Sequence, residues 1–445
     1  MRSDQQQAIN RLAGTSATAF LCAVLCVYPL YIDKFSNLGV TKFTGCFTLF
    51  LLFLLWLVAC TAIGARVPRP RNANAGRDVT LWGVLAFAGT SLISTFTSLS
   101  PMASTWGLGG YYGGLMLVLF TAAGYWAVRS YLDLENLDFV FWVLGITTSI
   151  VAVLYVLNIF NIDLIGAYAD TAVVERAQFF STLGQKDFNG CFFSVALPIV
   201  FYQFLNAKDT RTAVWTGIPA AFGALALAVV DSEALALGIG AAVMVLVCHK
   251  NFTTRHLRRA ALISAAFFGW AAWMHYMRAS VYTQGGTALL AKLGAWQVAL
   301  PCMAASLLLW LVLFVLARKG IAAQAPLYLP GRVITIAVLA VGALAFVLAN
   351  AMPNRPLPES LHNLLVFNDD WGTYRGVAWR AAFGTWADGS LLRKIVGIGP
   401  GMMHTAVAAW AGDAMTARMA TFYAAHNEYL EQLLTTGILG LAAWL

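Results

Sequence analysis

Charged residues are scarce in this sequence, and their scarcity sets its class. Only 11% of the 445 residues are charged, against about 25% in an ordinary soluble domain, while 60% are hydrophobic. A chain of this composition lacks the polar surface of a water-soluble protein. Apolar runs of about 20 residues, the length that crosses a bilayer, recur along the whole chain. We therefore expect a polytopic membrane protein.

Several other features are missing. The apolar runs show no barrel-type alternation, so we expect helices that satisfy their own backbone hydrogen bonds. No P-loop occurs, which argues against an ATP-driven transporter in one chain. The sequence also has no repeat of fixed period. All seven cysteines lie in or beside apolar runs, so neither a disulfide framework nor a zinc site is expected. The net charge of +8 sits in short loops and does not indicate nucleic-acid binding.

The hydropathy pattern predicts an all-α fold with about twelve membrane-spanning helices. With the N-terminus in the cytoplasm, sixteen Lys and Arg residues fall in the inner segments and six in the short outer loops, as the positive-inside rule requires. Two longer polar segments then lie outside the cytoplasm, at 161–187 and 353–426. The predicted spans are 16–33, 43–63, 79–99, 113–128, 139–160, 188–206, 213–230, 234–248, 260–277, 293–317, 333–352 and 428–445.

The predicted organisation has three parts. Residues 1–352 form a transmembrane bundle of about eleven helices, and residues 353–427 form an extracytoplasmic catalytic loop. Prolines 353, 356 and 358 predict an irregular exit from the membrane at the start of that loop. Residues 428–445 form a last helix that stops without a polar flank, as in a truncated chain.

The outer segment re-enters apolar sequence at His426. A histidine titrates near neutral pH and accepts a proton from a hydroxyl group, although a lone His at this place is also a common interfacial residue. Asn427 is a natural N-cap, and Glu431 lies one turn later, near the positive end of the helix dipole. Part of this segment is therefore structural whatever its function. His362 and His404 rank below His426, because neither opens an apolar helix.

Arginines in the outer segments are candidates for phosphate contacts. Residues 371–386 show apolar residues at helical spacing, and this helix carries Arg375 and Arg380. A guanidinium offers a planar, permanently charged fork that matches phosphate oxygens, while a solvated surface charge is the alternative. The Gly-Ile-Gly-Pro-Gly stretch at 397–401 predicts a tight turn, since Pro400 lacks an amide that would cradle a phosphate.

The earlier outer segment runs from Arg176 directly into a span. Lys186, Asp187 and Asn189 then lie at membrane depth, where polar groups are costly unless they are paired or face a cavity. A snorkelling Lys beside an N-cap Asp is the structural alternative. A cavity here would make Lys186 and Asn189 substrate-binding candidates.

These motifs resemble the O-antigen ligase and polymerase superfamily. The resemblance rests on residues 426–430 with 437–440, on Arg375-x-x-x-Trp379 with 396–401, and on 176–189. It implies a helical membrane glycosyltransferase that moves a glycan from an undecaprenyl-diphosphate carrier to an acceptor hydroxyl or amine outside the cytoplasm, without metal or cofactor. Members often carry Ser-Arg where this chain has Ser232-Glu233, which puts a phosphate contact at that position in doubt.

The resemblance also implies roles for individual residues. His426 would be the general base that activates the acceptor. Arg375 and Arg176 would hold the diphosphate and offset the charge on the leaving group. We expect these three side chains to converge at the mouth of a lipid-accessible cavity. The predicted substrate-binding residues are Arg380, Lys186, Asn189, Asn427 and Glu428.

Several functions share these features. A ligase, a polymerase of lipid-linked repeat units and a protein O-glycosyltransferase use the same donor and differ in the acceptor, which is a glycan, a lipid or a protein. A transporter or flippase of lipid-linked glycan is an alternative of another class, and it predicts charges inside the bundle on both sides of the midplane. A structural scaffold is a third. The expected location is the plasma membrane, with the bilayer as partner.

Overall fold

The chain is almost entirely helical. The computed structural model describes residues 3–66, 78–107, 111–280, 293–321, 323–352, 357–416 and 422–445, and it is about 79% helical. Its named strands are β1 (Phe179–Phe180) and β2 (Gly184–Gln185), which pair antiparallel. The predicted all-α class is confirmed. Two of the exit prolines and five basic residues used for the orientation lie outside the described residues, namely Pro353, Pro356, Arg2, Arg69, Arg71, Arg77 and Lys292.

Within the described residues, eight helical segments are long and apolar enough to cross a membrane. They confirm a membrane protein, while the count of twelve spans stays a prediction. The predicted spans 113–128, 234–248 and 260–277 correspond to α5 (Leu115–Tyr131), α9 (Glu233–Cys248) and the more polar α10 (Thr254–Ser280). The eight segments are Asp4–Leu30, Phe35–Ala62, Val79–Phe96, Leu134–Ile159, Lys186–Asn206, Thr210–Val229, Trp296–Arg318 and Tyr328–Ala351.

The chain folds into two compact units. The first unit comprises residues 1–17, 46–132 and 339–445, and the second comprises 18–45 and 133–338. Three helices contribute residues to both units, namely α1 (Ser3–Leu30), α2 (Leu38–Ala62) and α13 (Tyr328–Ala351). The predicted division at residues 352 and 427 follows the hydropathy pattern instead, and it stays a prediction.

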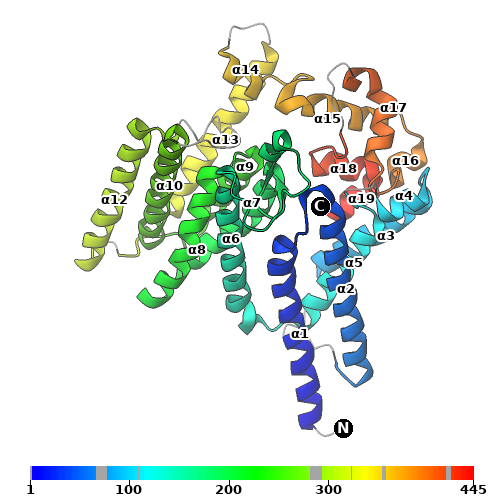
Figure 1. The fold of residues 1–445 in the computed structure, drawn as a ribbon, viewed down its shortest axis with the longest axis horizontal. Coiled ribbons are helices and arrows are strands. Elements are labelled where there is room, and N and C mark those ends of the chain that lie inside the picture. The colour runs from blue at the N-terminus through cyan, green and yellow to red at the C-terminus, as the bar shows by residue number, and fades with distance from the viewer. Residues whose placement is uncertain are drawn as a thin grey trace. The chain divides into compact units, whose positions relative to one another are not determined.

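The first unit joins the last helices of the chain to helices from its first third. The cyan α3 (Val79–Phe96) packs against α4 (Pro101–Trp106), α5 and the red α19 (Gly437–Trp444) (Figure 1). The predicted helix over 371–386 is confirmed as α15. In the predicted outer loop, α15 (Trp371–Ala387) packs against the shorter helices α14 (Glu359–Leu365), α16 (Leu391–Val396) and α17 (Met403–Thr416). It also packs against α18 (Glu428–Thr435), which follows the loop.

The second unit is a bundle around α7 (Lys186–Asn206). This helix packs against α6 (Leu137–Ile159), α8 (Thr210–Val229) and α9, and α10 packs against α8 and α12 (Trp296–Arg318), all in the green part of Figure 1. The buried core includes Phe193 and Leu197 of α7. Short 3-10 helices η1 (Phe35–Asn37), η3 (Leu134–Asn136) and η4 (Val173–Gln178) connect the longer elements.

The predicted last span, 428–445, is not one continuous helix. It consists of α18 and α19, each of eight residues, with a break at Gly437, whose φ is +72°. Eight helical residues span about 12 Å, well short of the ~30 Å hydrocarbon core. We therefore do not count α18 among the membrane-spanning helices.

The turn at 397–401 holds this break in place. The amides of Ile398 and Gly399 donate to the carbonyls of Leu434 (3.2 Å) and Thr435 (2.9 Å), which end α18 and have no partner within the helix. A Cβ on Gly397 would lie 2.2 Å from the Thr435 carbonyl oxygen. The predicted tight turn is confirmed, and its amides are committed to a backbone crossing rather than to a phosphate.

Candidate functional site

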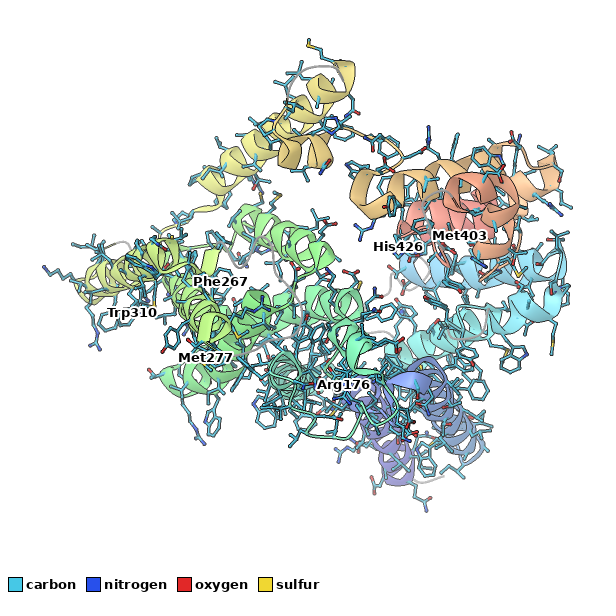
Figure 2. The ribbon with its side chains drawn as sticks, turned by 45° about the horizontal axis from the view of Figure 1, so that its top comes forward. Arg176, Phe267, Met277, Trp310, Met403 and His426 are labelled. Carbon is cyan, nitrogen blue, oxygen red and sulfur yellow. The ribbon has the colours of Figure 1, made fainter. Side chains whose placement is uncertain are left out.

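The site in the first unit is built on α15. Small and β-branched side chains along one face of this helix let the backbones of α17 and α18 approach closely, and they form one buried cluster. Ala425, in the loop before α18, is fully buried in the same cluster as Met403 of α17. Figure 2 shows Met403 near His426, the next residue after Ala425. The α15 members of the cluster are Val377, Ala378, Ala381 and Ala382.

His426 lies in a strained stretch of backbone. Its φ is +50°, in the left-handed region that only a few per cent of non-glycine residues adopt, and its side chain is exposed. The ring of Phe422 stands edge-on to the imidazole, with 6.1 Å between centroids. Strain of this kind persists where the surroundings over-determine the conformation, and it concentrates at functional sites.

Two side chains hold the residue before His426. The amide of Ala425 donates to Oε2 of Glu431 (2.7 Å), and the carbonyl of Ala425 accepts from Nε1 of Trp379 (3.0 Å). Glu431 belongs to α18 and Trp379 to α15. Asn427 follows directly and caps α18, because its Oδ1 accepts from the amide of Leu430 (3.2 Å). The backbone is thus bound on both sides of His426.

Arg375 lies on the same face of α15 as Trp379. The two residues are four apart, which puts them about 6 Å from each other along the helix axis. Since Trp379 contacts Ala425, this face is the one turned toward the His426 loop. Arg375 is half-buried, and it follows Tyr374, whose φ is +68°. A convergence of Arg375 with His426 stays a prediction.

Arg380 faces another direction. It is five residues after Arg375, a rotation of about 140° around the helix. Its guanidinium forms an ion pair with Asp369, and it lines an open cavity of about 580 Å³ together with Val377 and residues 408–413 of α17. The two arginines of α15 therefore serve different surfaces.

The remaining candidates next to His426 have partners inside α18. The carboxylate of the exposed Glu428 accepts from Nε2 of Gln432 (3.2 Å), and Asn427 is the N-cap that the sequence predicts. Glu431 is less exposed, and burial raises the pKa of its carboxyl group to about 7, which the neighbouring Glu428 reinforces. The hydrogen bond from the Ala425 amide acts in the opposite direction.

His404 has a structural position. Its Nδ1 lies 2.9 Å from the carbonyl oxygen of Phe422, and its ring stacks on Tyr423 with 4.6 Å between centroids. His404 thus fixes the loop segment that leads to His426. His362 belongs to the short helix α14, away from these contacts in sequence. The ranking of His426 above His362 and His404 stays a prediction.

Arg176 belongs to the second unit, on the 3-10 helix η4 (Figure 2). Its guanidinium carbon lies 5.5 Å from the ring centroid of Tyr168, a cation–π distance, and Nε makes a long contact to the carbonyl of Thr171 (3.5 Å). Tyr168 is buried and donates to the carbonyl of Phe179. Convergence of Arg176 with His426 and Arg375 stays a prediction.

Asn189 is a fully buried anchor of the loop that precedes α7. Its Nδ2 donates to the carbonyls of Phe180 (3.2 Å), Gly184 (3.1 Å) and Gln185 (3.1 Å), and its Oδ1 accepts from Oγ of Ser181 (2.6 Å). These bonds use both ends of the amide to hold the β1–β2 turn. Asn189 therefore has a structural role in the loop that carries the other candidates.

Lys186, a predicted substrate-binding residue, belongs to a polar cluster at the start of α7. Lys186 pairs with Asp231 at 3.8 Å, and the carboxylate of Asp187 accepts from Oγ of Ser232 (3.0 Å). Arg278, at the end of α10, interacts electrostatically with Asp231. The three polar residues at 231–233 stand between apolar runs, where polar groups are costly unless they are paired or face a cavity.

Among the described residues, no group of three or more His, Cys, Asp or Glu side chains could hold a metal ion. Comparisons with protein-family models, with curated proteins and with solved structures find no match for this chain. The site therefore stands on its own geometry.

Proposed function

We propose that this protein is a membrane glycosyltransferase that moves a glycan from an undecaprenyl-diphosphate carrier to an acceptor on the outer face of the plasma membrane. The observation that carries the proposal is the state of His426. This imidazole is exposed on a strained backbone that two helices hold, with Arg375 on the adjoining face of α15. A residue that only capped a helix would need neither the strain nor the bracing.

The chemistry follows from these groups. The neutral imidazole of His426 accepts the proton of an acceptor hydroxyl or amine, which then attacks the anomeric carbon of the glycan. The bond between that carbon and the diphosphate oxygen breaks, and undecaprenyl diphosphate leaves with the electron pair. The guanidinium group of Arg375 stabilises the negative charge on the departing diphosphate. The proton passes from the imidazole to water, which regenerates the base.

The membrane arrangement belongs to the same proposal. The N-terminus is cytoplasmic, and residues 353–427 lie outside, so that His426 stands where a lipid-linked donor presents its glycan. The eight apolar segments support membrane insertion. The excess of basic residues in the other loops supports the orientation. Ligase, polymerase and protein O-glycosyltransferase activities all use this arrangement.

The test compares envelope glycans and lipid-linked intermediates on gels from cells that carry the intact protein, His426→Ala or His362→Ala. His362 is the matched control, because it belongs to the same predicted outer segment and is also followed by Asn. A polymerase predicts single repeat units in place of a ladder with His426→Ala. A ligase predicts a full ladder retained on the carrier.

Equal glycan patterns for the intact protein and His426→Ala, at equal protein level, would remove the catalytic assignment. A transporter or flippase of lipid-linked glycan is the second candidate. It predicts charges on both sides of the membrane midplane, whereas Lys186, Asp231 and Arg278 all lie in predicted outer segments. That function predicts that exchange of Arg278 abolishes glycan export while His426→Ala does not.

A further inference from the structure

We infer that Glu431 and Trp379 are positioning residues that hold His426 in its working geometry by gripping the backbone of Ala425 from two helices. This inference rests on the proposed function and extends it to residues that touch no substrate. The sequence places Glu431 only near the positive end of a helix dipole, and it places Trp379 only in the Arg-x-x-x-Trp motif.

The grip uses both polar groups of one peptide residue. Ala425 is fully buried, so its amide and carbonyl depend on protein partners. Glu431 supplies an acceptor for the amide at 2.7 Å, and Trp379 supplies a donor for the carbonyl at 3.0 Å. The next residue, His426, has the left-handed backbone. Fixing Ala425 on one side and the Asn427 cap on the other leaves the His426 backbone little room to relax.

The two partners arise from unrelated parts of the sequence. Trp379 is 46 residues before Ala425, and its ring packs against Trp371, with 5.0 Å between centroids, which limits its movement. Glu431 is six residues after Ala425, and its helix is bound at its far end to the 397–401 turn. A shift of either helix therefore displaces Ala425, and His426 with it.

Glu431 can affect His426 in two ways, through the position of its hydrogen-bond acceptor or through its negative charge. A carboxylate near an imidazole can also act through its charge, which predicts that a neutral residue fails at position 431. A hydrogen-bond acceptor acts through its geometry, which predicts that Gln succeeds, because its amide oxygen reaches the same place. Burial raises the pKa of Glu431 to about 7. At neutral pH the carboxyl group is therefore uncharged in part of the protein molecules, and in these it binds the Ala425 amide as a neutral acceptor.

The experiment uses the full-length protein in membrane vesicles, with lipid-linked repeat units extracted from the producing cells as donor. The variants are Glu431→Ala, Glu431→Gln, Trp379→Phe and the control Trp386→Phe. Trp386 is also half-buried on α15, and its Nε1 also donates to a backbone carbonyl, that of Lys394 (3.2 Å). His426→Ala is measured in the same series, together with the amount of folded protein.

We expect Glu431→Ala to lower kcat about 100-fold and Trp379→Phe about 10-fold, since a displacement near 1 Å of a catalytic group has effects of this size. In both variants KM for the donor should stay within about twofold of the wild-type value. Glu431→Gln and Trp386→Phe should keep kcat within about threefold of wild type. A merely structural role would reduce the amount of folded protein without changing kcat per folded molecule.

A second readout does not depend on transfer. Diethyl pyrocarbonate modifies accessible imidazoles, and peptide mass spectrometry reports the rate at His426 separately from that at the other histidines. We expect Glu431→Ala and Trp379→Phe to change this rate, while Glu431→Gln and Trp386→Phe leave it at the wild-type value. An unchanged rate in the first pair, or a Gln variant as impaired as Ala, overturns the inference.

The two proposals fail in different ways. If His426→Ala transfers glycan normally while the modification rate responds to Glu431 and Trp379, the grip stands and the proposed function fails. If His426→Ala is inactive while Glu431→Ala and Trp379→Phe behave as wild type in both assays, the proposed function stands and the grip is refuted.

Discussion

The segment around His426 and the loop around Asn189 have the same signature in sequence, since each places polar residues where an apolar stretch begins. In the structure they differ. His426 is exposed on left-handed backbone, and side chains from two helices bind the residue before it. Asn189 is fully buried, and its amide group is committed to four partners inside its own loop.

This difference separates two uses of polar residues near a membrane. A buried amide whose hydrogen bonds are all internal has nothing left for a ligand, and its removal affects folding. An exposed imidazole on a braced, strained backbone affects folding little, and the surrounding structure serves its placement. The two regions therefore make opposite predictions: loss of activity without unfolding around His426, and unfolding around Asn189.

The largest expected effect is on transfer by His426 variants. His426→Asn and His426→Ala should each lower the transfer rate about 10²- to 10⁴-fold, the usual contribution of a general base. Asn tolerates left-handed backbone better than Ala, so His426→Asn should keep the wild-type unfolding temperature while losing activity. The measurements are initial transfer rates in vesicles and thermal unfolding in detergent. If His426→Asn transferred glycan at the wild-type rate, the role of His426 would be structural, like that of Asn189.

The turn at 397–401 that binds the end of α18 requires a glycine at position 397. Gly397→Ala should therefore destabilise the protein by about 4 kcal/mol. Gly397 has a φ of +81°, and a Cβ there would lie 2.2 Å from the Thr435 carbonyl oxygen. Conformations of this kind cost non-glycine residues about 1–3 kcal/mol, and overpacking adds about as much. Gly342→Ala in α13 is the control, with no atom within 4 Å of its Cβ, and it should cost nothing. Equal unfolding midpoints for both variants would contradict the backbone crossing.

Local patterns in the sequence were enough for the helix that carries Arg375. Apolar residues at helical spacing predicted 371–386, and the structure has α15 over Trp371–Ala387. The same local reasoning failed at 428–445, where hydropathy predicts one span. The break at Gly437 depends on carbonyls of α18 bound by amides of Ile398 and Gly399, more than 30 residues away in sequence. Such a contact leaves no periodic signal near the break.

The grip on Ala425 escaped the sequence for a similar reason. Glu431 was assigned to the helix dipole from its position in the first turn, but its carboxylate reaches back to the Ala425 amide. Trp379 was recognised as part of a motif, while its partner lies 46 residues further on. Residue types and spacing identified the candidates, and only tertiary structure says which of them bind one another.

Asn189→Ala tests the other side of the comparison. We expect it to lower the free energy of unfolding by about 3 kcal/mol, because buried carbonyls and a hydroxyl lose their partner at about 1–3 kcal/mol for each group left unsatisfied. Asn136→Ala in the same unit is the control, since that amide makes a single bond of 3.3 Å to Thr18. Thermal unfolding in detergent measures both. A stable Asn189→Ala protein with impaired transfer would instead return Asn189 to the substrate site.

The smallest expected effect concerns pH and sharpens the same contrast, since Glu431 titrates and Asn189 does not. Burial raises the pKa of Glu431 from 4.5 to about 7 in the folded protein. Between these values the unfolded chain has lost a proton that the native state retains, so this group's contribution to stability falls as pH rises and levels off above pH 7. Glu431→Gln removes that contribution. The stability of wild type relative to this variant should therefore fall by about 2 kcal/mol between pH 5 and pH 7.5, while the difference between wild type and Asn136→Ala stays constant. A difference that stays constant over this range would mean that the native carboxyl is already ionised at pH 5, and that a charged Glu431, not a neutral acceptor, binds Ala425.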